Sequence, residues 1–170
     1  MLLPLVAGNL LLGPAMLPSA QGQLQAVPGP QVPPQVPKSL QPLLNTLKEL
    51  GFQLRLAAPP AKGAYGQFEP RTKTLWVHPL AFELGIGVQT LLHEAVHAAQ
   101  SCPHGTLTTI GWRLPLETTV RQEIEGITYL RYHNANKAIE REAFAMQGQS
   151  KAQERIITAL KQRCTRGANR

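Results

Sequence analysis

Apolar residues recur from residue 39 onward with the spacings of helices and short strands. Ser39 can cap the N-terminus of a first helix, Pro42 is tolerated in its first turn, and Gly51 is typical of a helix end. Five leucines share one face of this helix: Leu40, Leu43, Leu44, Leu47 and Leu50. The pattern predicts an amphipathic helix that packs this face against a core.

Three short segments after this helix alternate between apolar and polar residues. Phe52–Leu56 predicts one strand, and Tyr65–Phe68 with Thr72–His78 predicts a hairpin, which Pro79 ends. The second arm of the hairpin precedes an apolar helix. We therefore expect that arm to form a sheet edge, where an extended peptide can pair with the backbone.

Helical spacing dominates the rest of the chain. Four more helices are predicted: Val88–Gln100, a helix from about Val120 to Leu130, one through Ile139–Gln147, and Lys151–Arg163. Asn134 or Asn136 can cap the third of these. The order of helix, small sheet and then helices is that of an α+β fold. We expect one such domain over residues 39–170.

The N-terminal stretch, residues 1–20, is apolar and has no charged side chain. Residues 5–17 are long enough for the apolar core of a signal peptide, and Pro18-Ser19-Ala20 supplies small residues for cleavage. Its prolines and glycines interrupt the length that a membrane span needs, so we expect no stable span in the mature chain. We expect export to the periplasm or the extracellular space. The stretch lacks a basic residue, which leaves open an apolar arm packed on the domain, or a cytoplasmic or membrane-tethered protein that keeps its leader.

Residues 21–38 are rich in proline and glutamine, with a dense run from Pro28 to Pro34. Such a composition cannot bury a core and favours extended backbone. The sequence therefore predicts a semi-rigid linker between the leader and the folded domain.

The formal net charge is +7, from 17 Lys and Arg against 10 Asp and Glu. An excess of positive charge can indicate an anionic partner. The basic residues are scattered, however, and only 5% of the chain is aromatic, so no platform for stacking bases is present. We expect no nucleic-acid partner.

The helix predicted over Val88–Gln100 contains an unusual charge pattern. Between Leu84 and Pro103 the ionisable side chains are His93, Glu94, His97 and Cys102. A helix this apolar is normally buried, and burying two imidazoles and a carboxylate is costly unless something satisfies them. Histidines at i and i+4 lie on one helix face, where both can bind one Zn²⁺ ion. The pattern predicts a metallohydrolase core.

Thr90–Ala99 resembles the active-site helix of the zincin metallopeptidases. The resemblance is strong over these ten residues and extends to the rest of the domain through the order of elements. It implies that His93 and His97 bind zinc and that Glu94 is the general base for the metal-bound water, with a peptide or protein as substrate. It also implies a small zincin-like α+β domain. The alternative, a histidine pair satisfied by backbone carbonyls, leaves Glu94 unexplained.

A catalytic zinc needs a third protein ligand. Metzincins use a further histidine after an intervening glycine; here Gln100 replaces that glycine, and His104 comes one residue too late. Gluzincins use a glutamate on a later helix, and residues 139–145 resemble that element. Glu142 is preferred as the ligand because its helical neighbours are largely apolar, whereas those of Glu140, the alternative, are polar. An exposed charged helix without a ligand is the remaining interpretation.

Tyr129, near the end of the helix predicted to about Leu130, and the following Tyr132 and His133 could donate to the oxyanion of a tetrahedral intermediate. His78 is a further candidate for this role. Cys102 and Cys164 are the two cysteines of the chain. In an exported protein such an even number permits a disulfide, here between the end of the metal helix and the last helix.

Together these patterns predict an exported, zinc-dependent metallopeptidase of gluzincin-like type. Two alternatives stay open. The domain could keep a zincin fold to bind a peptide without catalysis, or it could be a metallohydrolase that acts on another bond. An intact Glu94 favours catalysis, because a site that only binds needs no base there.

Overall fold

The computed structural model describes residues 36–116, 118–131 and 136–165, which lie within one compact unit, Val32–Arg170. The leader expected at residues 1–20 and residues 21–35 of the expected linker lie outside this part of the chain, so both remain predictions. Among the described residues, no helix has the length and apolar character that a membrane span requires.

The described helices follow the predicted order with two additions, the short 3-10 helix η1 (Lys38–Leu40) and the short helix α2 (Pro79–Glu83). The others are α1 (Gln41–Glu49), α3 (Gly87–Gln100), α4 (Thr118–Arg131), α5 (Lys137–Gln147) and α6 (Ala152–Cys164). The sequence does not predict α2, because five residues are too few to show a helical repeat. Asn136 occupies the N-cap position of α5, although its side chain makes no cap hydrogen bond.

Ser39 does not cap α1, contrary to expectation. It lies inside η1, and Leu40 occupies the N-cap position of α1 without a side-chain cap hydrogen bond. The extra turn lets Leu40 join Leu43 and Leu47 in the core, where burial of the leucine face replaces the cap. Gly51 ends the helix as expected, with a φ of 81° that glycine adopts without steric cost.

The sheet has three strands, β1 (Gln53–Leu56), β2 (Gly66–Glu69) and β3 (Thr74–Val77). Strands β2 and β3 form the predicted hairpin, with Gly66 opposite Val77. The strand order is β1-β3-β2, and β1 runs parallel to β3. The expectation that the second hairpin arm forms an edge is therefore wrong: β3 is the central strand, and β2 is the edge strand that packs on α3. Sequence order alone does not reveal that the chain returns after β2 so that β3 pairs with β1.

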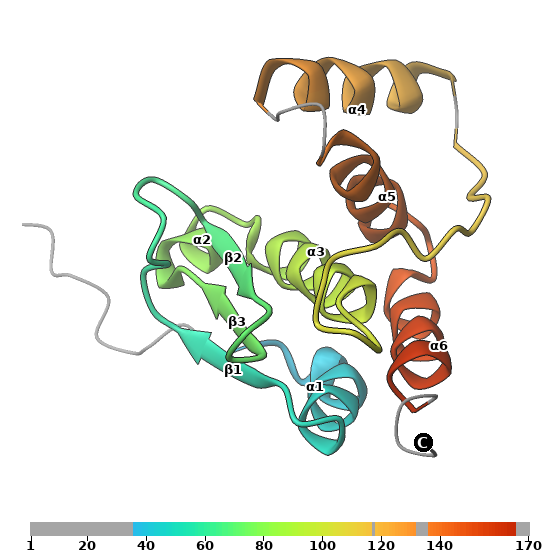
Figure 1. Ribbon diagram of the computed structural model, residues 1–170. Helices are drawn as coiled ribbons and strands as arrows, with labels where there is room; N and C mark the ends of the chain where they lie inside the picture. The colour runs from blue at the N-terminus through green and yellow to red at the C-terminus, as the bar shows by residue number, and fades with distance from the viewer. Residues whose placement is uncertain (1–35, 117, 132–135, 166–170) are drawn as a thin grey trace, which may run out of the picture. The chain divides into compact units, whose positions relative to one another are not determined.

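Helix α3 is the centre of the domain. Figure 1 shows it between the small sheet and the pair α5 and α6, and it packs against β2, β3, α2, α5 and α6. Every residue from 91 to 100 is buried, with the alanines Ala95, Ala98 and Ala99 fully enclosed. Small side chains let the neighbouring elements approach the helix closely. The mixed α+β class is confirmed. The part of α3 that carries the two histidines is buried, as its composition predicts.

Cys102 and Cys164 form the expected disulfide, which joins the segment after α3 to the last residue of α6. Beside it, Arg163 donates hydrogen bonds to the carbonyl oxygens of Ala99 at 2.9 Å and Cys102 at 2.8 Å. These carbonyls lie at the C-terminal end of α3, where helix carbonyls lack partners within the helix. A disulfide is typical of oxidising compartments, in agreement with export.

Reducing the disulfide should destabilise the domain. The two cysteines are 62 residues apart in sequence, and closing a loop of that length contributes about 4 kcal/mol in the chain-entropy description. We expect the urea midpoint of the wild type to fall when reductant is added. The double variant Cys102→Ser/Cys164→Ser is the control, since reductant should not change its midpoint. An unchanged wild-type midpoint would contradict the prediction.

Candidate metal centre

His93 and His97 lie one turn apart on the buried part of α3. Their Nε2 atoms are 3.0 Å apart, and the two rings meet edge to face at an interplanar angle of 84°. The residues are 8% and 6% exposed. The i, i+4 spacing thus brings two imidazole nitrogens to one buried point, as predicted.

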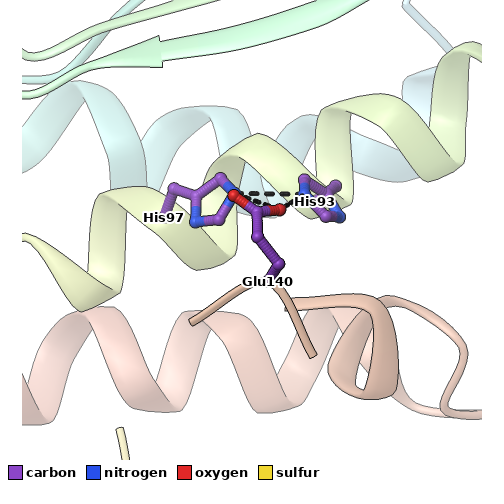
Figure 2. A group of neighbouring side chains, drawn as sticks. All are labelled: His93, His97 and Glu140. Atoms are coloured by element: carbon purple, nitrogen blue, oxygen red, sulfur yellow. Dashed lines mark hydrogen bonds and ion pairs between the residues drawn. The ribbon is translucent and has the colours of Figure 1, made fainter. Parts of the chain in front are cut away.

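A carboxylate from α5 completes the cluster, and it belongs to Glu140. Its Oε2 atom lies 3.2 Å from His93 Nε2 and 3.5 Å from His97 Nε2, and the three side chains converge in Figure 2. Of the two candidates for the third ligand, Glu140, the alternative, meets the two histidines, and the preferred Glu142 does not. Residues two apart on a helix point in nearly opposite directions, so only one of these glutamates can face α3 at this point. Apolar neighbours within α5 did not identify that face.

Glu142 has a different environment. Its Oε2 accepts hydrogen bonds from Gln100 Nε2 at 2.8 Å and from the Ile110 N–H at 2.7 Å, and its Oε1 accepts from the Gly111 N–H at 2.7 Å. The carboxylate thus joins α5 to the loop that follows α3. The position of this half-buried carboxylate has a structural reason other than metal binding, since it satisfies backbone donors of an irregular segment.

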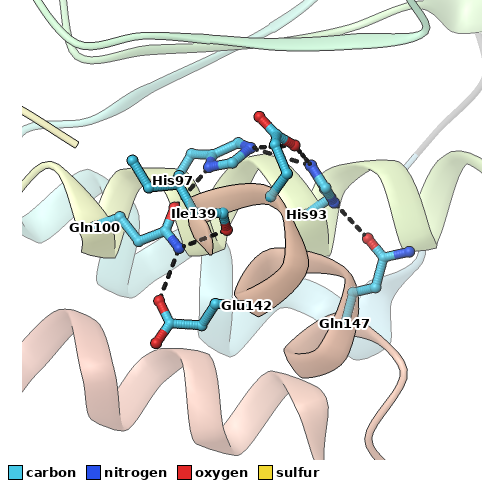
Figure 3. A network of polar contacts seen from close by, with 7 residues as sticks. His93, His97, Gln100, Ile139, Glu142 and Gln147 are labelled. Atoms are coloured by element: carbon cyan, nitrogen blue, oxygen red, sulfur yellow. Dashed lines mark hydrogen bonds and ion pairs between the residues drawn. The ribbon is translucent and has the colours of Figure 1, made fainter. Parts of the chain in front are cut away.

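Two glutamines hold the histidine rings from behind. Gln147 Oε1 lies 2.8 Å from His93 Nδ1, and Gln100 Oε1 lies 2.7 Å from His97 Nδ1 (Figure 3). In both rings, therefore, Nδ1 faces a side-chain amide while Nε2 faces the cluster. A hydrogen bond at one ring nitrogen sets which nitrogen is left to bind a metal.

The three donor atoms lie close enough together to hold a metal ion. Two imidazole nitrogens and one carboxylate oxygen form a common donor set for catalytic zinc, with a fourth position open. Their separations of 3.0, 3.2 and 3.5 Å compare with an edge of about 3.3 Å for a tetrahedron with bonds of about 2.0–2.1 Å. Among the described residues, this is the cluster of His, Cys, Asp and Glu side chains that could hold a metal ion.

Electrostatics within the metal-free cluster favours an ion pair. Burial acts to raise the pKa of Glu140, but hydrogen bonds from His93 and His97 and their charges outweigh it and lower the pKa to about 2. Burial acts to lower the pKa of His97, but its hydrogen bond to Glu140 and the nearby carboxylates outweigh burial and raise the pKa. A divalent cation would compete with protons for the same atoms.

Acid should remove the contribution of Glu140 to the stability of the metal-free protein. Its native pKa of about 2 lies below its ordinary value of 4.5, so protons bind the unfolded state more readily. The stabilisation is present above pH 4.5 and is lost as the pH falls toward 2. Over this window, urea unfolding should show a larger loss for the wild type than for Glu140→Gln. Equal losses in the two proteins would count against the ion pair.

Glu94 lies beside the histidines at the wall of a cavity. The residue is 6% exposed, and burial raises the pKa of its carboxyl against the opposing effect of the two imidazoles. The Phe68 N–H of β2 donates a hydrogen bond to this carboxylate. The cavity has a volume of about 420 Å³. Its lining includes Gly66 of β2, Thr90, His93 and Glu94 of α3, and Phe144 and Gln147 of α5.

Gly66 allows β2 to approach Glu94 closely. A Cβ atom at this position would lie 2.5 Å from Glu94 Oε1 and 2.5 Å from Thr90 Cγ2, which is closer than real side-chain carbons approach other atoms. Thr90 is β-branched and has little freedom to move away. Gly66 therefore lets the edge strand β2 pack against α3 beside Glu94, the candidate general base.

Gly66→Ala should destabilise the domain by about 1–3 kcal/mol and displace Glu94, because an extra methyl group overpacks this contact. Gly126→Ala is a matched control. Gly126 lies within α4, and a Cβ there would meet nothing within 4 Å, so alanine should stabilise by about 0.5–1 kcal/mol. Thermal unfolding of both variants tests the contrast. A Gly66→Ala protein as stable as Gly126→Ala would refute it.

The suggested oxyanion donors are not brought to the site by any described contact. Tyr132 and His133 lie outside the described residues, and Tyr129 lies in α4 with a side chain that the structure does not describe. His78 has another role, because its Nδ1 accepts a hydrogen bond from the Leu80 N–H at 3.0 Å and so caps α2.

Four residues beside the cluster were not among the predicted site residues: Gln100, Gln147, Gly66 and Phe144. The ring centroid of Phe144 lies 4.6 Å from that of His93. Gln100 carries a detectable signal: it is an amide on a helix that is otherwise apolar around the motif. Buried amides need partners, so its presence there indicates a polar network. The other three have no local signal, since their role depends on elements that meet only in the fold.

Comparisons with known proteins add a family without an assigned activity. A model of the family described as a domain of unknown function, DUF8637, matches residues 71–165. This span contains the hairpin arm β3, the cluster residues His93, His97 and Glu140, Glu94, and both cysteines. No curated protein and no solved structure matches the chain. Because the matched span covers more than half of the sequence, the chain belongs to the DUF8637 family.

Proposed function

We propose that this domain is a zinc-dependent hydrolase that cleaves peptide bonds, with Glu94 as its general base. The observation that carries the proposal is the buried cluster of His93, His97 and Glu140 beside a buried glutamate and a cavity. This combination agrees with the resemblance of the α3 motif to zincins and with a gluzincin-like third ligand. A zincin-like form of the α+β fold is part of the same proposal.

His93, His97 and Glu140 would hold the ion. When bound, zinc would act as a Lewis acid toward a carbonyl oxygen and would lower the pKa of water. Gln147 and Gln100 orient the two rings so that Nε2 of each faces the ion's position. The low exposure of the cluster excludes competing solvent and strengthens electrostatic interactions there.

Glu94 would move the proton. Its carboxylate would accept a proton from the attacking water and then donate it to the amine nitrogen of the leaving group. A general base works best when its pKa is near the working pH, and burial raises the pKa of Glu94 in that direction. A metal-binding scaffold without catalysis would not need a carboxyl group buried at this cost.

The cavity suits an extended polypeptide. It lies where edge strand β2 meets α3, so a peptide backbone could run beside β2 while a peptide carbonyl reaches the cluster. Among the described residues, Glu94 is the one acidic residue in the lining, and no Lys or Arg lines it. Exposed Tyr65 and Ile86 at the lining add apolar surface. We propose a neutral, apolar segment of a peptide or protein as substrate, outside the cytoplasm.

Metal analysis together with peptide cleavage tests the proposal. Purified wild type should contain one zinc ion per protein chain and should cleave an unstructured polypeptide. Chelation should stop cleavage, zinc should restore it, and His97→Ala should lack both metal and activity. A folded wild type that takes up no zinc overturns the metal centre. A zinc-loaded wild type that binds peptides without cleaving them supports the non-catalytic alternative.

A further inference from the structure

A chain of hydrogen bonds leads from His97 away from the cluster (Figure 3). Its central residue is Gln100, which is completely buried at the end of α3. Its Oε1 lies 2.7 Å from His97 Nδ1, and its Nε2 lies 3.0 Å from Ile139 O and 2.8 Å from Glu142 Oε2. All three contacts have the length of good hydrogen bonds.

These contacts allow one orientation of the Gln100 amide. The carbonyl oxygen of Ile139 and the Glu142 carboxylate are both acceptors, so they require the NH₂ end of the amide. Turning the amide over would place Oε1 against two acceptors in a buried site, which costs the hydrogen bonds and adds repulsion. Gln100 Oε1 must therefore face His97.

The orientation of this amide determines the tautomer of His97. Oε1 can only accept, so Nδ1 of His97 must carry a hydrogen and donate it. In the neutral ring Nε2 then has a free lone pair, and it points toward His93 Nε2 and Glu140 Oε2. This is the form of imidazole that binds a metal through Nε2.

Glu142 is in turn fixed from two sides. It lies on α5, and its carboxylate accepts the N–H groups of Ile110 and Gly111 in the loop after α3. A carboxylate held by two backbone donors cannot rotate away from Gln100 without breaking charge-assisted hydrogen bonds. The helix α5 thus supplies one glutamate to the cluster and another to the network behind it.

We propose that Glu142 and Gln100 are positioning residues that hold His97 in its Nδ1–H tautomer. We call the series Glu142–Gln100–His97 the amide relay. The role assigned to it in metal binding rests on the proposed function, whereas its effect on the tautomer does not. The relay explains why α5 needs both glutamates and why the residue three after His97 is a buried amide.

Zinc affinity in a double-mutant cycle tests the relay. In Glu142→Gln the new NH₂ group can donate to Gln100, so the amide can turn and present its own NH₂ group to His97 Nδ1. Competition with a chelator should show zinc binding about 10–100-fold weaker, as for other residues that orient metal ligands. In a Gln100→Met background the same change should have no further effect, because the residue through which it acts is absent.

A loss of equal size in both backgrounds would show that Glu142 only supports the loop, and would overturn the relay. An unchanged affinity in Glu142→Gln would also overturn it. Glu154→Gln, which removes a charge from an exposed position of α6, is the matched control and should bind zinc like the wild type.

A second measurement needs neither a variant nor a metal. Nitrogen-15 NMR of the histidine rings in metal-free wild type, at a pH where His97 is neutral, should show the hydrogen on Nδ1. A hydrogen on Nε2 would overturn the relay even if zinc binds and peptides are cleaved. Conversely, a wild type that takes up no zinc but keeps the Nδ1–H tautomer would remove the proposed function and leave the relay in place.

Discussion

Glu94→Gln should lower the rate of peptide hydrolysis by about 10²–10⁴-fold while zinc stays bound. Glutamine has nearly the same shape and can still accept the Phe68 N–H hydrogen bond, but it cannot take a proton from water. The proposed metal donors His93, His97 and Glu140 are unchanged in this variant. Steady-state cleavage assays with zinc analysis on the same samples measure both quantities.

Although Glu94→Gln should lower activity, it should raise the stability of the metal-free protein at neutral pH. Burial raises the native pKa of Glu94 above its ordinary 4.5, so the metal-free native state holds this proton more firmly than the unfolded state. Stability therefore falls as the pH rises from 4.5 through the raised pKa. Metal-free Glu94→Gln avoids this loss and should unfold at a higher urea concentration than wild type at neutral pH. Full activity in Glu94→Gln would exclude the general-base role.

Glu140→Gln should lose zinc, and by a larger factor than Glu142→Gln. Glu140 supplies the oxygen 3.2 and 3.5 Å from the two histidine nitrogens, and a neutral amide there is a much poorer zinc ligand than a carboxylate. Residues that only orient metal ligands change the affinity by at most about 100-fold, and we expect the zinc affinity of Glu140→Gln to fall by more than that. Chelator competition on the two variants, under identical conditions, measures the difference.

The order of the two variants should be reversed for stability, with Glu142→Gln losing more than Glu140→Gln. Glu142 accepts three hydrogen bonds that join α5 to Gln100 and to the loop at Ile110 and Gly111. Hydrogen bonds to a charged group contribute about 1.5–3 kcal/mol each, so metal-free Glu142→Gln should be the less stable protein. Urea unfolding without metal tests this order. If Glu142→Gln were the variant that lost zinc completely while Glu140→Gln kept it, the assignment of the third ligand would be reversed.

Local periodicity was sufficient to predict most helices, the β2–β3 hairpin and the disulfide partners. The reason is that helix and strand periods, turn residues and a cysteine pair are properties of short segments or simple counts. The predicted cap at Ser39 was wrong because a cap preference is also a property of a short segment. Burial of Leu40 in the tertiary core outweighs that local preference.

By itself, the sequence determined that His93, Glu94 and His97 belong together, since one buried helix with an i, i+4 histidine pair leaves few other ways to satisfy them. Only the tertiary structure brought Glu140 rather than Glu142 to the two histidines, made β2 an edge strand, and placed Gln100 and Gln147 behind the rings. Apolar neighbours within α5 indicate which residues are buried. They do not indicate which side of α5 meets α3, because that choice depends on packing between segments far apart in the chain.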